Sequence, residues 1–201
     1  MPSEDRGTSE FHEVWERLET WLELHAPDDY RALRAPASDA AINSVTDGAF
    51  PLCDELRALL RHHDGVPLLR SAGDPGSFLP GTRGLYGTQR LRAGHQHMRE
   101  NVSWSIEEET SSLVIGETAH THWIPFAGDV TGQELVVDHR PGATYGQVLE
   151  YDDEYCRYEP RWRSLTHFFG EVADALETMS RIDHYLPQIR EDSLSVEWRV
   201  G

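Results

Sequence analysis

Lysine is absent from this 201-residue sequence, and all 18 basic side chains are arginine. The sequence also contains 35 Asp and Glu residues, so the formal net charge is −17 at pH 7. Such a surface repels the phosphate backbone of nucleic acids and the anionic face of a membrane. It attracts a basic protein and speeds the encounter with it. The composition therefore argues against a nucleic acid or a membrane as partner. It leaves two interpretations, a basic protein partner or acidity that serves solubility alone.

Cysteine is scarce, and long apolar runs are missing. Cys53 and Cys156 are too few for the disulfide framework of a secreted domain, and both suit small buried apolar positions. No stretch approaches the roughly 18 apolar residues that span a bilayer. Residues 1–9 are polar and lack the apolar centre of a signal peptide. We therefore expect a cytoplasmic protein.

Helical periodicity dominates the first part of the sequence. Apolar residues recur at steps of three and four through residues 11–24, which predicts an amphipathic helix. A short helical stretch is expected around Tyr30 to Leu33, and Ser38 suits the N-cap of the helix that follows Pro36. Residues 50–65 predict another helix, in which Asp64-Gly65 suits the C-terminal cap because glycine accepts a left-handed conformation.

The period changes further along, where short apolar runs alternate with Gly, Pro and Asp turns. The expected elements are a helix at 85–101, strands at 122–127, 133–138, 146–151 and 155–158, and a last helix at 164–178. This order predicts an α+β domain with N-terminal helices, a central, mostly antiparallel sheet and a closing C-terminal helix. The domain is expected at 11–178, after a disordered tail at 1–10 and before a C-terminal extension at 179–201.

Four apolar residues of the expected strands are assigned to the core: Trp123, Phe126, Leu135 and Val137. We expect them to lie on a sheet packed by the helices at 11–24 and 164–178. In a fold of this kind one sheet face packs on helices and the other can stay open.

Candidate catalytic and metal-binding sets are incomplete. A zinc site needs three or four ligands in fixed geometry, whereas His120-Thr121-His122 and His95-Gln96-His97 supply two each, with no HExxH or CxxC motif. His62-His63-Asp64 fits a helix end better than an acid–base unit, since adjacent helical side chains point in different directions. Cys53 has no recognisable oxyanion hole. We therefore expect neither enzyme activity nor a metal or cofactor, and rank a small hydrolase or metal enzyme last.

Several segments follow one another in a distinctive order. They are the Trp-rich helix Trp15 to Leu22, the entry Pro36-Ala37-Ser38, the run from Phe50-Pro51 to Asp64-Gly65, the strand Trp123-Ile124-Pro125-Phe126, the strand Glu134 to Asp138 with Pro141-Gly142, and the helix Leu165 to Phe169. Their order and spacing resemble the SUKH superfamily of fungal cell-wall assembly regulators and bacterial toxin-immunity proteins. The resemblance spans residues 11–178 and implies a SUKH-like fold.

The resemblance also implies a function. Bacterial members neutralise a co-encoded toxin, often a nuclease, by covering its active site, and an acidic blocker suits the basic groove of many nucleases. The main hypothesis is therefore a non-enzymatic protein-binding domain that acts as an immunity protein against a cognate toxin. The alternative is an intracellular regulatory adaptor linked to cell-wall or envelope signalling, as in the fungal members.

The candidate partner-binding residues lie near the loops that link the strands: Asp129, Glu134, Tyr151, Asp152, Asp153, Glu154 and Tyr155. Interface energy concentrates in a few buried aromatic or arginine anchors, so the two tyrosines are the expected hot spots. The carboxylates are expected to set the association rate and its salt dependence. A second acidic run, Glu107-Glu108-Glu109, is expected as an exposed insertion.

Overall fold

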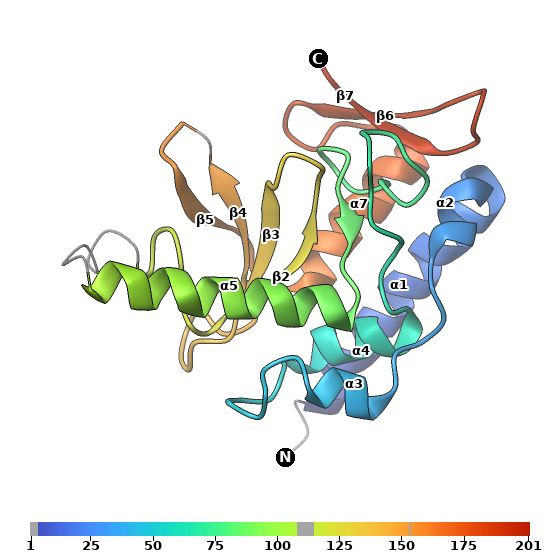
Figure 1. Cartoon of the computed structure of the whole chain (residues 1–201). Helices are drawn as coiled ribbons and strands as arrows, with labels where there is room; N and C mark the ends of the chain where they lie inside the picture. The colour runs from blue at the N-terminus through green and yellow to red at the C-terminus, as the bar shows by residue number, and fades with distance from the viewer. Residues whose placement is uncertain (1–3, 108–114, 153) are drawn as a thin grey trace.

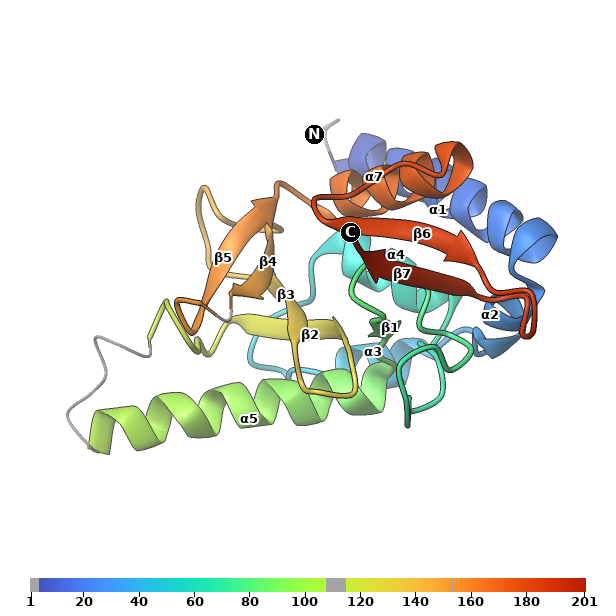
Figure 2. The same ribbon diagram turned by 90° about the horizontal axis from the view of Figure 1, so that it is seen from above.

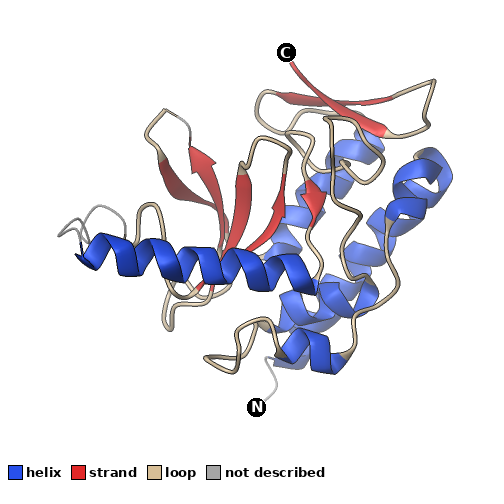
Figure 3. Cartoon of the chain, in the orientation of Figure 1, coloured by secondary structure: helices blue, strands red, loops and turns tan. Residues whose placement is uncertain are grey.

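The computed structural model describes residues 4–107, 115–152 and 154–201. Helices cover one face of a five-stranded sheet, and one long helix crosses the other face (Figures 1 and 3). The helices are α1 (Glu4–His25), α2 (Pro27–Ala32), α3 (Asp39–Asn43), α4 (Asp54–His62), α5 (Thr88–Glu107) and α7 (Leu165–Thr178). The strands are β1 (Gly84–Leu85), β2 (Trp123–Gly128), β3 (Glu134–Asp138), β4 (Val148–Asp152), β5 (Arg157–Trp162), β6 (Tyr185–Ile189) and β7 (Val196–Val200). The predicted α+β class is confirmed. No described helix is both long and apolar enough to cross a membrane.

The apolar stripe of α1 forms the centre of the helical layer, as its spacing predicts. Phe11, Trp15, Leu18 and Leu22 are fully buried, and Trp15 meets Phe169 of α7 edge to face at 5.2 Å. The helix begins at Glu4, so residues 4–10, which we expected as part of a disordered tail, are helical. Most of these residues are polar, and polar helical turns carry no apolar period by which to recognise them.

Asp64-Gly65 has a different role from the one predicted. The C-cap of α4 is His63 in an extended conformation, so Asp64 and Gly65 lie beyond the helix. The Oδ1 atom of Asp64 instead accepts a hydrogen bond from the backbone N of Thr88 at 2.6 Å and so caps the start of α5. Gly65 has a φ of +69°, and a Cβ there would lie 2.3 Å from the backbone N of Gly87. Only glycine fits this crossing of two chain segments.

The sheet is antiparallel in the order β1-β2-β3-β4-β5. Phe126, Leu135 and Val137 are fully buried in the core cluster that also contains the apolar stripes of α1 and α7. This part of the core prediction is confirmed. Their alternation along β2 and β3 follows from the two-residue period of a strand.

Trp123 is fully buried as predicted, but it belongs to a second cluster. It lies with Met98 and Val102 of α5 and with Val136 and Leu149 of the sheet. The expected open face is therefore covered where α5 packs on β2 (Figure 1). The helix that we placed at 85–101 runs from Thr88 to Glu107, and its extra length supplies Val102 to this cluster. The expected insertion at 107–109 has Glu107 at the end of α5, and Glu108 and Glu109 lie outside the described residues.

The chain does not close on a helix. After α7 the strands β6 and β7 form a two-stranded sheet, and Val196 and Trp198 enter the main core. Trp198 Nε1 donates to the carbonyl O of Phe78 at 2.8 Å. The buried carboxylate of Asp29 accepts from the backbone N of Gly76 at 2.7 Å and of Val196 at 2.6 Å. Residues 179–201, which we expected as an extension, therefore contribute to the core.

Candidate protein-binding surface

The candidate binding residues come from two turns at the same end of the sheet. The antiparallel register pairs Leu135 with Glu150, which places Glu134 at the level of Tyr151. The β2–β3 turn and the β4–β5 turn consequently project in the same direction (Figure 1). The structure thus brings six of the seven predicted residues to one end of the sheet: Asp129, Glu134, Tyr151, Asp152, Glu154 and Tyr155. Asp153 lies outside the described residues.

The β2–β3 turn uses its carboxylate to hold its own shape. Asp129 Oδ1 accepts from the backbone N of Thr131 at 2.8 Å and of Gln133 at 3.0 Å. An aspartate that bonds to backbone two residues on makes a local turn. Asp129 is half-buried, whereas Val130 beside it is exposed. Asp129 is therefore first a turn residue.

Glu134 is held inside a polar cluster. Its Oε1 accepts from the hydroxyl of Tyr86 at 3.0 Å, and that hydroxyl accepts from Nη2 of Arg90 at 2.9 Å. The Arg90 guanidinium also lies 3.8 Å from the centre of the Tyr86 ring. Burial raises the pKa of Glu134, and the Tyr86 bond and the Arg90 charge oppose that rise. Glu134 therefore offers a partner little free charge.

The β4–β5 turn carries the exposed members of the set. Asp152 Oδ1 accepts from the backbone N of Glu154 at 2.9 Å and of Tyr155 at 3.0 Å, so this carboxylate also shapes its turn. Glu154 is exposed, and Tyr155 is 61% exposed. Tyr151 is half-buried against the ring of Tyr158 at 5.2 Å. Among the described residues of the predicted set, Glu154 and Tyr155 are therefore the most accessible to a partner.

The candidate nucleophile and acid–base residues have structural partners. Burial raises the pKa of the Cys53 thiol to about 12, so it is not a thiolate near neutral pH. His62 Nε2 lies 2.7 Å from Nδ1 of His12. His63 Nδ1 lies 2.7 Å from the carbonyl O of Arg34, and its Nε2 lies 2.9 Å from Oε1 of Glu19.

Both neighbours of the His63 ring are acceptors, and both ring nitrogens donate only in the imidazolium form. Burial lowers the pKa of His63, but the bonds to Glu19 and to the Arg34 carbonyl more than offset it and raise that pKa. Below that raised pKa, His63 donates to both acceptors and links the end of α4 to Glu19 of α1.

The remaining histidines of interest gather around Phe50. His122 stacks on Phe50 at 4.7 Å, while His95 and His139 lie 5.4 and 5.5 Å from it. His95 Nε2 donates to the carbonyl O of Thr121 at 2.9 Å. Within the described residues, no group of three or more His, Cys, Asp or Glu side chains has the arrangement of a metal site. His95, His122 and His139 therefore pack around Phe50 as structural residues.

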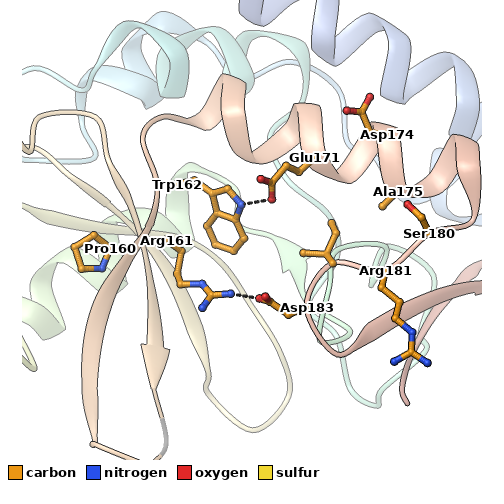
Figure 4. Close-up of a pocket in the computed structure, with 10 residues that line it drawn as sticks. Pro160, Arg161, Trp162, Glu171, Asp174, Ala175, Ser180, Arg181 and Asp183 are labelled. Carbon is orange, nitrogen blue, oxygen red and sulfur yellow. Dashed lines mark hydrogen bonds and ion pairs between the residues drawn. The ribbon is translucent and has the colours of Figure 1, made fainter.

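A hollow of about 570 Å³ lies between β5, α7 and the segment that leads into β6 (Figure 4). Trp162 Nε1 donates to Glu171 Oε2 at 2.6 Å across it, and Arg161 pairs with Asp183. Asp174 stands further along α7 (Figure 4). Most charged groups of the hollow are thus already paired within the chain.

Sequence reasoning missed the carboxylates on the solvent side of the helical layer. Glu10, Glu13 and Glu16 recur every three residues on α1, and Glu171, Asp174 and Glu177 do so on α7. The same spacing was visible in the sequence, but that α1 and α7 lie side by side was not (Figure 2). Two segments about 160 residues apart supply this face.

Comparisons with known proteins agree with the fold. A model of the SMI1 / KNR4 family (SUKH-1) matches residues 36–171. A "KNR4/SMI1 homolog" of Yarrowia lipolytica (strain CLIB 122 / E 150) is 30% identical over 128 residues. That match covers 60% of this chain and only 16% of the yeast protein. Because the family model spans more than half of its length, the chain belongs to the SMI1 / KNR4 family (SUKH-1).

Proposed function

We propose that this chain is a non-enzymatic protein-binding domain whose partner is a protein with a basic surface, and that it acts in the cytoplasm as an immunity protein against a cognate toxin. The observation that carries the proposal is the charge, −17 for 201 residues, on a SUKH-1 domain. Opposite charge steers association and raises its rate.

Many of the arginines are engaged within the chain and are not free to repel a basic partner. Among the side chains that the structure describes, ten arginines already pair with carboxylates of the same chain: Arg17, Arg31, Arg61, Arg83, Arg92, Arg140, Arg157, Arg161, Arg190 and Arg199. A basic partner therefore meets an excess of solvent-facing carboxylates. A nuclease that presents a basic substrate groove has the complementary chemistry, because its own substrate is a polyanion.

A second function is favoured by the yeast relative. That protein is named a "KNR4/SMI1 homolog", and the region similar to this chain is a small part of it. In that relative the fold is one piece of a larger protein, which suits a regulatory adaptor. For this chain, an adaptor role linked to cell-wall or envelope signalling is the alternative.

The neighbouring gene discriminates between the two. If an adjacent reading frame is toxic when expressed alone, co-expression of this chain should restore growth, and the two proteins should co-purify. Their affinity should fall as salt rises, because part of the attraction is between exposed charges. If growth is not restored and no complex forms with any adjacent product, the immunity function is wrong. A stable complex with an envelope-signalling protein instead would favour the adaptor.

A further inference from the structure

An apolar groove is open to solvent between α1 and the end of α7. It has a volume of about 470 Å³ and contains Trp21 and Leu24 of α1. Leu24 is 73% exposed, although it belongs to the helix that carries the largest apolar stripe of the fold. Three carboxylates form its rim: Glu13, Glu16 and Glu177. An apolar floor with a polar rim is the usual anatomy of a protein interface.

The rim arises because two helices run in the same direction. Phe11 contacts Phe169 near the start of each helix, and Arg17 meets Glu177 further along both. On a helix, residues three and four apart share a face. The spacing of three therefore aligns Glu10, Glu13 and Glu16 beside the carboxylates of α7. Neighbouring like charges at this spacing destabilise a helix, so the stripe is not explained by stability.

Arg17 shows how these carboxylates hold a guanidinium. Its Nε and Nη2 atoms donate to Glu177 at 2.5 and 2.7 Å, and Nη2 also donates to Asp174 at 2.5 Å. Among the side chains that the structure describes, no basic group lies within 4 Å of Glu10, Glu13 or Glu16. All three are exposed, and Glu13 and Glu16 line the apolar groove. Two basic side chains also line the groove: His25, and Arg17, which is already paired with Asp174 and Glu177.

We propose that this groove is the docking site for a basic amphipathic helix of the partner protein. One apolar side chain of that helix inserts between Trp21 and Leu24, and its arginines or lysines bind Glu13, Glu16 and the neighbouring carboxylates. Helix-in-groove recognition combines an apolar anchor with flanking charges in this way. The inference rests on the proposed protein-binding function and specifies its surface and its chemistry.

The test uses a defined probe. A fluorescein-labelled 18-residue synthetic helix with arginines on one face and leucines on the other is titrated with the full-length chain, and fluorescence anisotropy gives the affinity at low and high salt. Glu13→Gln/Glu16→Gln should weaken binding about three- to tenfold and reduce its salt dependence. Leu24→Ser should weaken it about fivefold with the salt dependence unchanged.

Two matched controls separate the groove from general effects. Glu107→Gln/Glu191→Gln removes the same number of exposed charges elsewhere, and Leu68→Ser changes a leucine that is 67% exposed outside the groove. Both should stay within about twofold of the parent protein. If the two charge variants weaken binding equally, attraction is general and the groove proposal is wrong. It is also wrong if the parent chain does not bind the arginine helix, or if Leu24→Ser binds as tightly as Leu68→Ser.

These outcomes are independent of the immunity test. If the chain protects cells from a toxin but does not bind the arginine helix, the immunity function is supported and the proposed docking site is wrong. If the chain binds the helix in the groove but does not protect cells from an adjacent toxin, the docking site is supported and the immunity function is wrong.

Discussion

Replacing Gly65 by alanine should destabilise the protein far more than the loss of a glycine in a turn. The Cβ of alanine would lie 2.3 Å from the backbone N of Gly87 and 2.5 Å from the carbonyl C of Tyr86. Both neighbours are backbone atoms, so no side-chain rotation relieves the contact. The two segments must separate. The hydrogen bond from the backbone N of Thr88 to Asp64, which caps α5, is then lengthened or lost.

The expected cost follows from three contributions. A left-handed alanine costs about 1–2 kcal/mol, backbone displacement by an inserted group costs about 1–3 kcal/mol, and a lost N-cap costs about 0.5–2 kcal/mol. We expect Gly65→Ala to lower the free energy of unfolding by about 2.5–7 kcal/mol, a large share of the ~5–15 kcal/mol available to a typical protein.

Gly146→Ala is the matched control. Gly146 has a φ of +83°, but a Cβ there meets nothing within 4 Å. Its variant should pay only the conformational cost of about 1–2 kcal/mol. Urea unfolding followed by circular dichroism measures both variants against the parent. Equal losses of stability in the two would show that the approach of Gly65 to Gly87 is unimportant and would refute the reasoning.

Four further predictions concern other parts of the molecule. Trp123→Ala should cost about 3–5 kcal/mol in urea unfolding, because a fully buried indole is removed from the α5 cluster; a loss below 1 kcal/mol would contradict that packing. Burial lowers the pKa of His139 to about 4, whereas the unfolded chain takes up this proton near pH 6.5, so its contribution to stability is complete above pH 6.5 and lost as the pH falls toward 4. Phenylalanine does not titrate, so the free energy of unfolding of His139→Phe should rise relative to that of the parent protein by about 3 kcal/mol between pH 7 and pH 4. A difference between the two proteins that does not change with pH would disprove this. A thiol reagent should label Cys156 in the native chain and Cys53 only after unfolding, since Cys156 is exposed and Cys53 is buried; rapid labelling of both would contradict the placement of Cys53. Neutralising Asp152, Asp153 and Glu154 together should slow association with an identified basic partner at low salt, and an unchanged rate at low and high salt would leave these residues as a solvated turn.

Elements with a strong local period were predictable from the sequence. The stripe from Phe11 to Leu22, the Ser38 cap and the β3–β4 hairpin depend on residues close together in the chain, and the Oγ of Ser38 does accept from the backbone N of Ala41. Features that depend on distant segments were not predictable. Asp64 caps a helix that begins 24 residues later, and Trp123 faces α5 because the pleat of β2 turns it away from α1 and α7.

The candidate binding surface likewise has a part that could be predicted from the sequence and a part that could not. The loops that carry Asp129 and Glu154 could be placed from the strand pattern, and the register confirms that they share one end of the sheet. Nothing in the sequence shows that Glu134 bonds to Tyr86, because that contact joins residues 48 positions apart. The acidic face of α1 and α7 could not be predicted for the same reason. The carboxylates of each helix, taken alone, are typical of any solvent-exposed helix face.

The packing of α1 against α7 also bears on how the protein is made. The ribosome synthesises Trp15 roughly 150 residues before Phe169, the ring it meets edge to face. Until then the apolar stripe of α1 has no complete partner, and an amphipathic helix without its partner is prone to aggregate. A fragment limited to residues 36–171, the part that matches the family model, would omit α1 and the β6–β7 hairpin. We therefore expect the shortest piece that folds on its own to extend beyond residues 36–171 at both ends.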